Sequence, residues 1–461
     1  MSDLDAIVKA YDVRGLVPDE LDESVARAVG AAFVDVLGAV SVITGHDMRA
    51  SGPGLAAAFA EGATARGADV VEVGLASTDL LYFASGMLGL PGAMFTASHN
   101  PARYNGIKLF RANAVPVGQD TGLTQVRDQA RGYLDGVAIT GEPGRRTSRE
   151  LLATYATYLR GLVDLRDIRP LTVVVDAGNG MGGFTAPAVL GDAVLPALPL
   201  TVIPLYFELD GRFPNHEANP LDPANLVDLQ RAVVEHGADL GLAFDGDADR
   251  CFVVGANGAA VSPSTITALV AVRELDKNPG AAIIHNLITS RAVPEVVREH
   301  GGVPVRTRVG HSFIKARMAE TDAAFGGEHS AHYYFRDFWR ADTGMLAALH
   351  VLAELGAQDR SLTDMVAPYV RYAGSGEINS TVTDPPARVA EVQAAFADRA
   401  TGTDDLDGLT VDLPDRAWFN LRASNTEPLL RLNVEARDAA AMTAIRDEVL
   451  GIVRAGAPAS R

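Results

Sequence analysis

Short β-branched runs alternate with longer helical segments over most of the chain. The segments 25–37 and 54–66 are predicted helices, and the runs 42–45 and 70–73 are predicted strands. At three joins a glycine ends a helix and a strand follows, as expected for a helix C-cap. These joins are Gly67, Gly237 and Gly301. The irregular spacing excludes a solenoid, and the order of elements is compatible with three βαβ-type domains.

Changes in composition indicate where the domains meet. The stretches near 141–149, 255–263 and 372–377 are predicted linkers. The predicted domains are 1–149, 150–255, 256–371 and 372–461. The last one has shorter runs and a terminal helix around 439–454, and it is therefore predicted to be a smaller α+β domain.

The stretch Thr96–Ala102 follows an apolar run at 90–95 that is predicted to be a buried strand. It places Ser98 beside a histidine and an asparagine at the end of that strand. A serine in this setting is a candidate nucleophile or phosphoryl carrier. The alternative is structural, because Ser98 and Asn100 are both good N-cap residues for a following helix.

Three carboxylates alternate in a tight turn between two apolar runs. Asp245, Asp247 and Asp249 can converge on one hard cation, for which Mg²⁺, Ca²⁺ or Mn²⁺ suits oxygen ligands better than Zn²⁺. An EF-hand is excluded, because Arg250 and Ala256 stand where its loop needs Gly and Glu. A solvated acidic turn is the alternative, but three like charges between buried strands repel unless a cation neutralises them.

The segment Arg422–Pro428 offers a guanidinium, two hydroxyls, an amide and turn N–H groups. These groups suit a tetrahedral anion, and the alternative is an ordinary polar turn that ends at its proline.

A second set of basic residues gathers within one short stretch. Its members are Arg306, Arg308, His311, Lys315 and Arg317. A basic helix face is the alternative for Lys315 and Arg317, whereas Arg308 and His311 follow an apolar run as a loop would.

Four motifs together resemble the α-D-phosphohexomutase family, and they occur in the family's order over most of the chain. They are 96–101, similar to the phosphoserine loop, 245–250, similar to the metal loop, 327–332, similar to the sugar-recognition loop, and 422–428, similar to the phosphate-binding loop. The segments 11–15 and 105–108 resemble further family motifs. The Glu-x-Ser-x-His form of the sugar loop is similar to the phosphomannomutase and phosphomannomutase/phosphoglucomutase branch.

The resemblance implies a four-domain architecture, in which three related α/β domains with mixed sheets precede a smaller C-terminal α+β domain. In chain order the domains would carry the phosphoserine, metal, sugar and phosphate loops. Such an enzyme interconverts hexose 6-phosphate and hexose 1-phosphate through a phosphoserine, with Mg²⁺ as cofactor and hexose 1,6-bisphosphate as intermediate and activator. Mannose and also glucose are the implied sugars, because a site that reads hydroxyls 3 and 4 leaves their difference at carbon 2 unread.

The resemblance also implies roles for individual residues. The implied catalytic residues are Ser98, Arg250, Lys108, His311 and Arg14. The implied metal ligands are a phosphorylated Ser98, Asp245, Asp247 and Asp249. The implied substrate-binding residues are Tyr11, His99, Arg308, Glu328, Ser330, Arg422, Ser424, Asn425 and Thr426. The sequence departs from the family pattern at two positions. Leu287 lies at or near the place of a ligand-contacting lysine found in some members. His329 replaces the more usual methionine and is expected to fill space, with a substrate contact as the alternative.

Two other functions stay open. One is a sister enzyme, either a phosphoglucomutase or a phosphoglucosamine mutase, and the sugar loop argues against the latter. The other is a non-catalytic sugar-phosphate sensor, which the presence of Ser98 and all three aspartates disfavours. The sequence leaves the oligomeric state open.

Charge and composition exclude several further classes of protein. A net charge of −18 over 461 residues argues against binding to nucleic acid, although an anionic sugar phosphate needs only local positive charge. The one cysteine, Cys251, lies in an apolar run and predicts a buried thiol in a reducing cytoplasm. The N-terminus does not resemble a signal peptide, and no run approaches the length of apolar residues that a membrane span needs.

Overall fold

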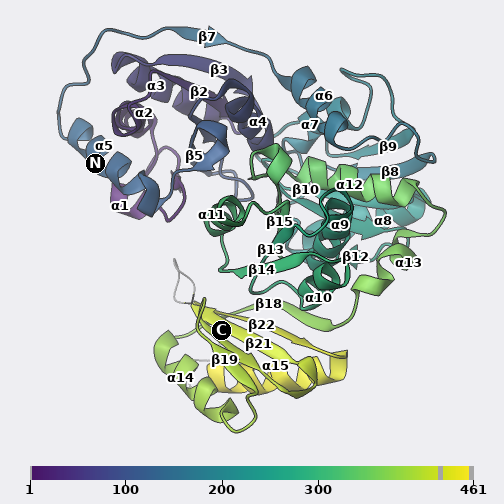
Figure 1. Ribbon diagram of the computed structural model, residues 1–461. Helices are drawn as coiled ribbons and strands as arrows, with labels where there is room; N and C mark the ends of the chain where they lie inside the picture. Colours follow the sequence, from purple (N-terminus) through teal and green to yellow (C-terminus); the bar gives the residue numbers. More distant parts are fainter. Residues whose placement is uncertain (1–2, 424–428, 456–461) are drawn as a thin grey trace.

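The computed structural model describes residues 3–423 and 429–455, which form four sheets in four successive parts of the chain (Figure 1). We call these parts domains I to IV. The first three sheets are mixed and the fourth is antiparallel. The predicted fold class, three α/β domains followed by a smaller α+β domain, is confirmed.

Domain I contains a seven-stranded sheet with the order β1-β5-β4-β2-β3-β7, in which β6 pairs with β5. Its strands are β1 (Val13–Leu16), β2 (Ser41–His46), β3 (Asp69–Leu75), β4 (Gly92–Phe95), β5 (Tyr104–Arg111), β6 (Val115–Pro116) and β7 (Arg146–Ser148). Its helices are α1 (Leu4–Ile7), α2 (Glu23–Leu37), α3 (Gly52–Ala65), α4 (Thr78–Leu88) and α5 (Leu123–Leu134).

Domains II and III each contain a five-stranded sheet, with the orders β12-β11-β10-β8-β9 and β14-β13-β15-β16-β17. Domain II comprises α6 (Leu152–Leu162), β8 (Leu171–Asp176), α7 (Gly182–Val189), β9 (Leu200–Leu205), α8 (Val227–Glu235), β10 (Leu240–Phe244), β11 (Cys251–Gly255) and β12 (Ala260–Val261). Domain III comprises α9 (Pro263–Lys277), β13 (Ala282–Asn286), α10 (Ala292–Glu299), β14 (Val303–Thr307), α11 (His311–Thr321), β15 (Phe325–Gly327), β16 (Tyr333–Phe335), β17 (Ala341–Asp342), α12 (Gly344–Gly356) and α13 (Leu362–Val366).

The first three domains share one arrangement of four strands. In chain order these are β2 to β5, β8 to β11 and β13 to β16, and each set lies in the sheet order second, first, third, fourth. The first three strands of each set are parallel, and the fourth returns antiparallel through a hairpin. The predicted phosphoserine, metal and sugar loops are the turns of these three equivalent hairpins.

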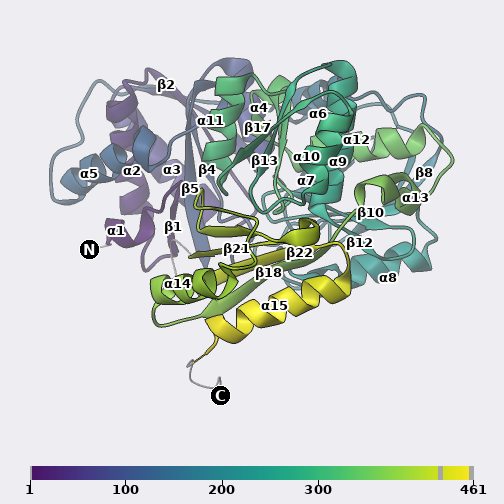
Figure 2. The same ribbon diagram turned by 60° about the horizontal axis from the view of Figure 1, so that its bottom comes forward.

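Domain IV contains a fully antiparallel sheet with the order β18-β22-β21-β20-β19. Its elements are β18 (Ala373–Thr381), α14 (Pro385–Phe396), β19 (Gly402–Asp404), β20 (Leu409–Asp412), β21 (Trp418–Ala423), β22 (Leu429–Ala436) and α15 (Ala439–Val453). Figure 2 shows α14 and α15 on the face of this sheet that points away from the other domains. The opposite side of the sheet therefore faces domain III.

The cores of the domains are joined to different degrees. One continuous cluster of buried apolar side chains runs from α4 of domain I through the sheets of domains II and III. Domain IV has a separate cluster, and polar pairs such as Arg306 with Asp404 and Arg416 with Glu295 link it to domain III. Among the residues that the structure describes, no helix has the length and apolar character needed to cross a membrane.

Local sequence explains many of the element ends. The three glycines predicted to end helices all have a positive φ, between 58° and 91°. The predicted linkers are more regular than expected, because they contain β7, β12 and the start of β18. The sequence does not reveal β7 because this edge strand is exposed along its whole length and carries no apolar alternation. The thiol of Cys251 is buried, as predicted.

Candidate active site

Ser98 lies in the turn between β4 and β5, so no helix follows it and the N-cap alternative is wrong. Its φ of +50° lies in the left-handed region, which costs a non-glycine residue about 1–3 kcal/mol. The Thr96 hydroxyl accepts a hydrogen bond of 2.9 Å from the Ser98 N–H and supports this conformation. The turn directs the serine hydroxyl toward domain II.

The Ser98 hydroxyl contacts the predicted metal loop across the domain boundary. Its Oγ donates to Asp245 Oδ2 at 2.9 Å and lies 3.2 Å from His99 Nδ1. The metal loop is the turn between β10 and β11, and a Cβ on Gly246 would lie only 2.3 Å from the Ser98 carbonyl oxygen. The glycine is therefore needed for the close approach of the two loops.

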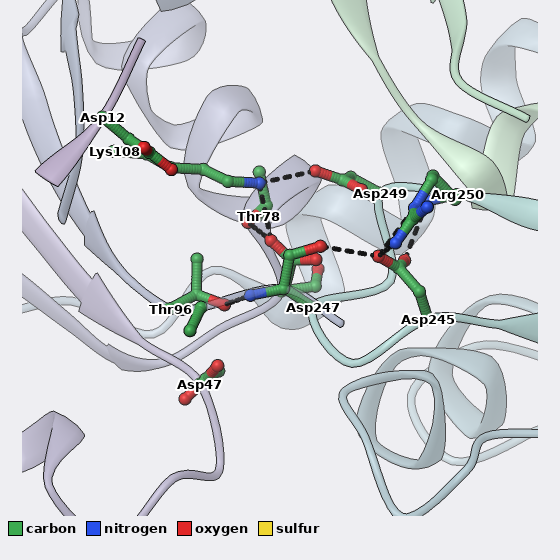
Figure 3. A network of polar contacts seen from close by, with 12 residues as sticks. Asp12, Asp47, Thr78, Thr96, Lys108, Asp245, Asp247, Asp249 and Arg250 are labelled. Atoms are coloured by element: carbon green, nitrogen blue, oxygen red, sulfur yellow. Dashed lines mark hydrogen bonds and ion pairs between the residues drawn. The ribbon is translucent and has the colours of Figure 1, made fainter. Parts of the chain in front are cut away.

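Two cationic side chains partly balance the three carboxylates, as Figure 3 shows. Lys108 Nζ lies 2.7 Å from both Asp247 Oδ2 and Asp249 Oδ2, and Arg250 Nε donates to Asp245 Oδ2 at 2.9 Å. Burial opposes the charge of Lys108, but Asp247 and Asp249 outweigh it and hold the pKa of this lysine well above its ordinary value. When all three carboxylates are ionised, three negative and two positive charges leave room for a further cation.

The three aspartates fit a hard divalent cation. One oxygen from each lies within 4.8 Å of the others. Asp247 Oδ1 and Asp249 Oδ1 are buried without a hydrogen-bond partner in the described part of the chain, which is a costly state that a metal ion relieves. Burial raises the pKa of Asp245 to about 8, against the effect of Arg250 and with that of the other two carboxylates. A bound cation favours the ionised form of such a group.

Thr78 joins the metal loop to domain I, and the sequence analysis missed it. Its hydroxyl donates to Asp247 Oδ2 at 2.5 Å, and its N–H donates to the Asp247 carbonyl at 3.0 Å. Thr78 is the first residue of α4, whose N-cap is Ser77. Because a helix N-terminus attracts negative charge, this end of α4 favours the ionised carboxylate.

Asp79, the next residue, links three domains beside the metal loop. Its Oδ2 accepts hydrogen bonds of 2.6 Å from the Tyr155 hydroxyl of domain II and 2.7 Å from the Thr343 hydroxyl of domain III. Its Oδ1 accepts from Ser77. Burial raises the pKa of Asp79 to about 6, although the three hydroxyls oppose this shift.

Arg14 and His99 lie beside the serine loop. Arg14 Nη1 donates to Asn100 Oδ1 at 2.5 Å and to the Ala97 carbonyl at 3.2 Å. Burial, followed by the charges of Arg250 and Arg14, holds the pKa of His99 well below its ordinary value. At neutral pH the His99 ring next to Ser98 therefore carries no charge.

Tyr11, Arg308 and His311 gather where domain I meets domain III. The Tyr11 ring stands edge-on to His311, with 4.9 Å between the ring centroids. The Arg308 guanidinium lies 4.8 Å from the Phe313 ring centroid, and its Nη2 is 3.9 Å from an oxygen of Asp407 in domain IV. Three predicted site residues from distant parts of the sequence are thus brought together.

Lys315 is not on an exposed basic helix face, which corrects that interpretation. It is buried, with its Nζ 2.7 Å from Asp342 Oδ1 and 4.1 Å from the Tyr82 ring centroid. Arg317, by contrast, is exposed as that interpretation expects. The sequence does not reveal the difference, because Asp342 and Tyr82 belong to other elements. Burial, followed by the charge of Lys315, lowers the pKa of His311 to about 3, so that its imidazole is neutral at pH 7.

The predicted sugar loop is the turn between β15 and β16. Glu328 is almost fully buried there, and its carboxylate accepts from Asn286 Nδ2 at 3.0 Å and from the Tyr334 hydroxyl at 2.5 Å. His329 Nδ1 lies 3.2 Å from the Ser264 hydroxyl, and burial lowers the pKa of this histidine. Neighbours within domain III therefore fix the orientation of the Glu328 carboxylate.

The other end of the sugar loop touches the metal loop. Ser330 Oγ lies 2.9 Å from His332 Nδ1, and His332 Nε2 lies 3.7 Å from Asp249 Oδ1. His332 and Arg250 also form an isolated antiparallel bridge. His332 is the last residue of the predicted sugar loop, and the sequence alone assigns it no role. Its contact with the metal loop makes it a further candidate site residue.

Arg422 lies on β21 and is paired within domain IV. Its Nη1 donates to Asn433 Oδ1 at 3.2 Å, and its Nη2 pairs with Glu377. Burial lowers the pKa of Arg422, and Glu377 opposes that shift. The other predicted members of the phosphate loop, Ser424, Asn425 and Thr426, lie outside the described residues.

The candidate site thus has one centre, which we call the transfer centre after its predicted role, and two groups of predicted binding residues around it. The centre comprises Ser98, Lys108, Asp245, Asp247, Asp249 and Arg250. The Tyr11 group and the sugar loop border it, whereas Arg422 lies in domain IV. Sequence reasoning also missed Arg49, which holds the serine loop, although it stands in a polar turn directly after a predicted strand.

Four family models match the chain in the same order as its domains. They describe α/β/α domains I, II and III and the C-terminal domain of phosphoglucomutase/phosphomannomutase, and they match residues 5–133, 153–258, 262–372 and 377–452. The chain therefore belongs to the phosphoglucomutase/phosphomannomutase family, that is, to the phosphohexomutases.

Relatives narrow the family to a branch. The chain is 40% identical to a phosphomannomutase of Escherichia coli, over 97% of this chain and 98% of the relative. It is 43% identical to a Xanthomonas campestris protein described as phosphohexose mutases, with the same coverage. A phosphoglucomutase/phosphomannomutase family protein from Burkholderia thailandensis superposes with a TM-score of 0.87 at 32% identity, over 100% of this chain and 99% of that one. The chain is an isomerase-class enzyme of the phosphomannomutase branch.

Proposed function

We propose that the protein interconverts mannose 6-phosphate and mannose 1-phosphate, and also the glucose phosphates, through a phosphoserine at Ser98 and a hexose 1,6-bisphosphate. The observation that carries this proposal is the 2.9 Å contact between Ser98 Oγ and Asp245 across the boundary of domains I and II. It joins a serine hydroxyl, three carboxylates and two cations in one buried centre, which suits phosphoryl transfer. Similarity to proteins named phosphomannomutase supports the substrate class.

The proposed reaction consists of two transfers in opposite directions. In the first, the bond between phosphorus and Ser98 Oγ breaks, a bond to a sugar hydroxyl oxygen forms, and the hydroxyl proton passes to a base. The bisphosphate then turns around. In the second, its other phosphoryl group moves to Ser98 Oγ, and the sugar oxygen that it leaves regains a proton. The enzyme ends as it began, with one phosphoryl group on serine.

The cations around the centre have separate parts in this proposal. Arg250 and Lys108 are tied to the carboxylates and stay charged, so they offset negative charge without moving. Arg14 holds the serine turn through Asn100 and Ala97. A neutral His311 can accept a proton, and the negative charge of a bound phosphate favours this by raising its pKa.

Asp245, Asp247 and Asp249 are the proposed Mg²⁺ ligands, and a phosphorylated Ser98 would add a further oxygen. Their unpartnered buried oxygens and mutual distances support a hard cation. When bound, the ion neutralises charge on the transferring phosphoryl group.

The sugar and the second phosphate are assigned to domains III and IV. Glu328 and Ser330 would bind hydroxyls 3 and 4, and Arg422 would grip the phosphate that is not being transferred. The guanidinium of Arg422 already pairs with the Glu377 carboxylate, which supports binding of an anion at this point. Because neither sugar contact reads carbon 2, the proposal includes both mannose and glucose.

A comparison of substrates tests this function. The protein is assayed with mannose 1-phosphate, glucose 1-phosphate and glucosamine 1-phosphate, each with Mg²⁺ and catalytic glucose 1,6-bisphosphate. We expect turnover of the first two, stimulation by the bisphosphate, and phosphate on Ser98 by peptide mass spectrometry. Turnover of the glucosamine compound alone would indicate the sister enzyme, and binding without any turnover would indicate a sensor.

A further inference from the structure

Arg49, on the loop between β2 and α3, is buried although it carries a charge, with 2% of its surface exposed. All five guanidinium N–H groups have an acceptor. Nε donates to Asp47 Oδ2 at 3.2 Å, and the other four N–H groups donate to main-chain carbonyls of the serine loop. These carbonyls belong to Ser98 (2.9 Å), Asn100 (2.6 Å), Pro101 (2.9 Å) and Tyr104 (2.9 Å).

Because all five N–H donors of Arg49 are in use, its contacts distinguish direct binding of a phosphate from an indirect role through the serine loop. An arginine that binds a phosphate directly offers it a fork of two N–H groups. Arg49 has no N–H group left for that purpose, and domain II covers it. The Phe213 ring lies 5.1 Å from its Cζ, and the chain at Gly211 passes so near that an added Cβ would be 2.7 Å from the Arg49 Cα. Arg49 therefore acts on the reaction through the serine loop.

Asp47 binds both of the residues, Arg49 and Thr96, that contact the main-chain carbonyl and N–H of Ser98. Arg49 donates to the Ser98 carbonyl, and the Thr96 hydroxyl accepts from the Ser98 N–H. Asp47 in turn accepts from the Arg49 N–H at 2.9 Å, from its Nε, and from the Thr96 hydroxyl. Figure 3 shows Asp47 and Thr96 near the carboxylates of the metal loop. The backbone of the strained serine is thus held on both sides.

We propose that Arg49 is the positioning residue that keeps Ser98 at its left-handed φ and so aims Oγ at Asp245 in both phosphoryl transfers. This inference rests on the proposed function. The equivalent loops support the hairpin turns of the other domains: the Met181 N–H donates to the Gly246 carbonyl at 2.9 Å, and Asn286 donates to Glu328 at 3.0 Å. Arg49 differs because one side chain makes four bonds to a single turn.

A single-turnover experiment with Arg49→Lys tests the proposal. Lysine keeps the charge but cannot reproduce the planar fork. Dephosphorylated enzyme is mixed with glucose 1,6-bisphosphate, and intact mass gives both the rate and the endpoint of phosphorylation. We expect the rate to fall about 100-fold, as for a misplaced nucleophile, while the endpoint stays near one phosphate per chain and KM changes less than about threefold. A purely structural role would lower the endpoint at an unchanged rate.

Arg160→Lys is the matched control. Arg160 also donates to three main-chain carbonyls, at Val189 (2.8 Å), Gly191 (2.5 Å) and Pro196 (2.6 Å), but these belong to domain II away from the hairpin turns. We expect a wild-type rate. Thr96→Val gives an independent test if Arg49→Lys does not fold, because it removes the acceptor of the Ser98 N–H and the hydroxyl contact to Asp47 while Arg49 keeps its own bonds to the serine loop. We expect it to lower the rate about tenfold.

The outcomes separate the inference from the function on which it rests. A wild-type protein that takes no phosphate on Ser98 would refute the proposed function. A wild-type protein that is phosphorylated, with unchanged rates in both Arg49→Lys and Thr96→Val, would refute the positioning role alone. An Arg49→Lys rate that is restored by saturating bisphosphate would make Arg49 a binding residue and would also overturn the inference.

Discussion

The transfer centre and the binding residues around it are held in different ways. Between domains I and II, contacts inside the protein fix each group, so that Ser98, Asp247 and Lys108 have partners from the other domain. On the side of domains III and IV, two arginines face carboxylates: Arg308 lies 3.9 Å from Asp407, and Arg422 pairs with Glu377. The hydrophobic cores divide differently, because one cluster joins domains II and III with α4 of domain I, whereas the rest of domain I and domain IV each have a separate cluster.

The difference matches the demands of the proposed reaction, in which the intermediate turns around. The bond-making atoms must return to the same place in both transfers, which favours a centre fixed by many contacts. The sugar and its second phosphate must be bound, released and bound again in the opposite sense. A carboxylate opposite an arginine suits that task, because it keeps the guanidinium oriented and a phosphate can take its place.

Removal of the proposed nucleophile should have the largest effect and should separate the transfer centre from the binding residues around it. Ser98→Ala should lower turnover by about 10³-fold or more, because it removes the oxygen that takes the phosphoryl group in the proposed reaction. The affinity for glucose 1-phosphate, measured by calorimetry, should change little, since Glu328, Ser330 and Arg422 lie in other domains. Near-wild-type turnover of the purified variant would sink the assignment.

Removal of the metal should have the next largest effect. Chelation should abolish turnover, and added Mg²⁺ should restore it, because the three aspartates are left with an uncompensated charge. Asp247→Asn should raise the Mg²⁺ concentration needed for half-maximal rate by at least about tenfold. Asp164→Asn is the control, because the Asp164 side chain pairs with the exposed Arg166 on the surface of domain II. Full activity in excess EDTA would contradict the site.

Arg422→Lys tests the exchangeable arginine of domain IV. Lysine cannot grip two phosphate oxygens at once, so kcat/KM should fall about 10- to 100-fold for mannose 1-phosphate and for glucose 1-phosphate alike. Arg399→Lys, in the same domain and paired with Glu448 at the surface, should behave as wild type. An unchanged Arg422→Lys enzyme would move the phosphate pocket elsewhere.

Glu328→Gln should have a smaller effect, which the two epimers should share. The substitution removes a charged acceptor but keeps the shape of the side chain, so we expect kcat/KM to fall roughly tenfold for both sugars. The ratio of the two kcat/KM values is the measurement, because Glu328 is not the partner of the 2-hydroxyl in the proposed site. Loss of one epimer alone would contradict the assigned sugar contacts.

Asp79→Asn probes the junction that supports the centre, and its effect is on stability. The pKa of about 6 in the folded protein lies above the ordinary value of 3.8, so the folded state binds this proton more tightly than the unfolded state. The resulting stabilisation is full below pH 4 and is lost as the pH rises through 6, by up to about 3 kcal/mol. Urea unfolding from pH 4 to 7 should therefore show a flatter pH dependence for Asp79→Asn than for wild type, and parallel curves would refute the shift.

The sequence predicted those parts of the molecule that depend on neighbours in the chain. The left-handed glycines at helix ends, the apolar strands and the alternating Asp245, Asp247 and Asp249 are local patterns. The order of the four motifs was sufficient for the fold class. The alternative of Ser98 as a helix cap failed, because a hairpin and a helix can begin with the same polar residues and only the return strand decides between them.

The parts that could not be predicted depend on contacts between distant elements. Lys315 resembles a surface lysine until Asp342 and Tyr82 are packed against it. Thr78 and Asp79 look like an ordinary helix start, and their partners are 169 and 264 residues away in the chain. Arg49 stands in a polar turn, and nothing nearby in the sequence indicates the four carbonyls that it binds.

The equivalent hairpins of domains I, II and III have a consequence for how such an enzyme can change. One repeated framework carries three different turns, to which the proposed function assigns a nucleophile, a metal ion and the sugar, and the strands below them keep the same order. New chemistry then needs only new residues in a turn of a few positions, while the strand residues that determine the fold stay unchanged. Copying a domain and editing its turn is a short route from a single ancestral unit to a multistep catalyst, and grafting turns between relatives is the corresponding route for the engineer.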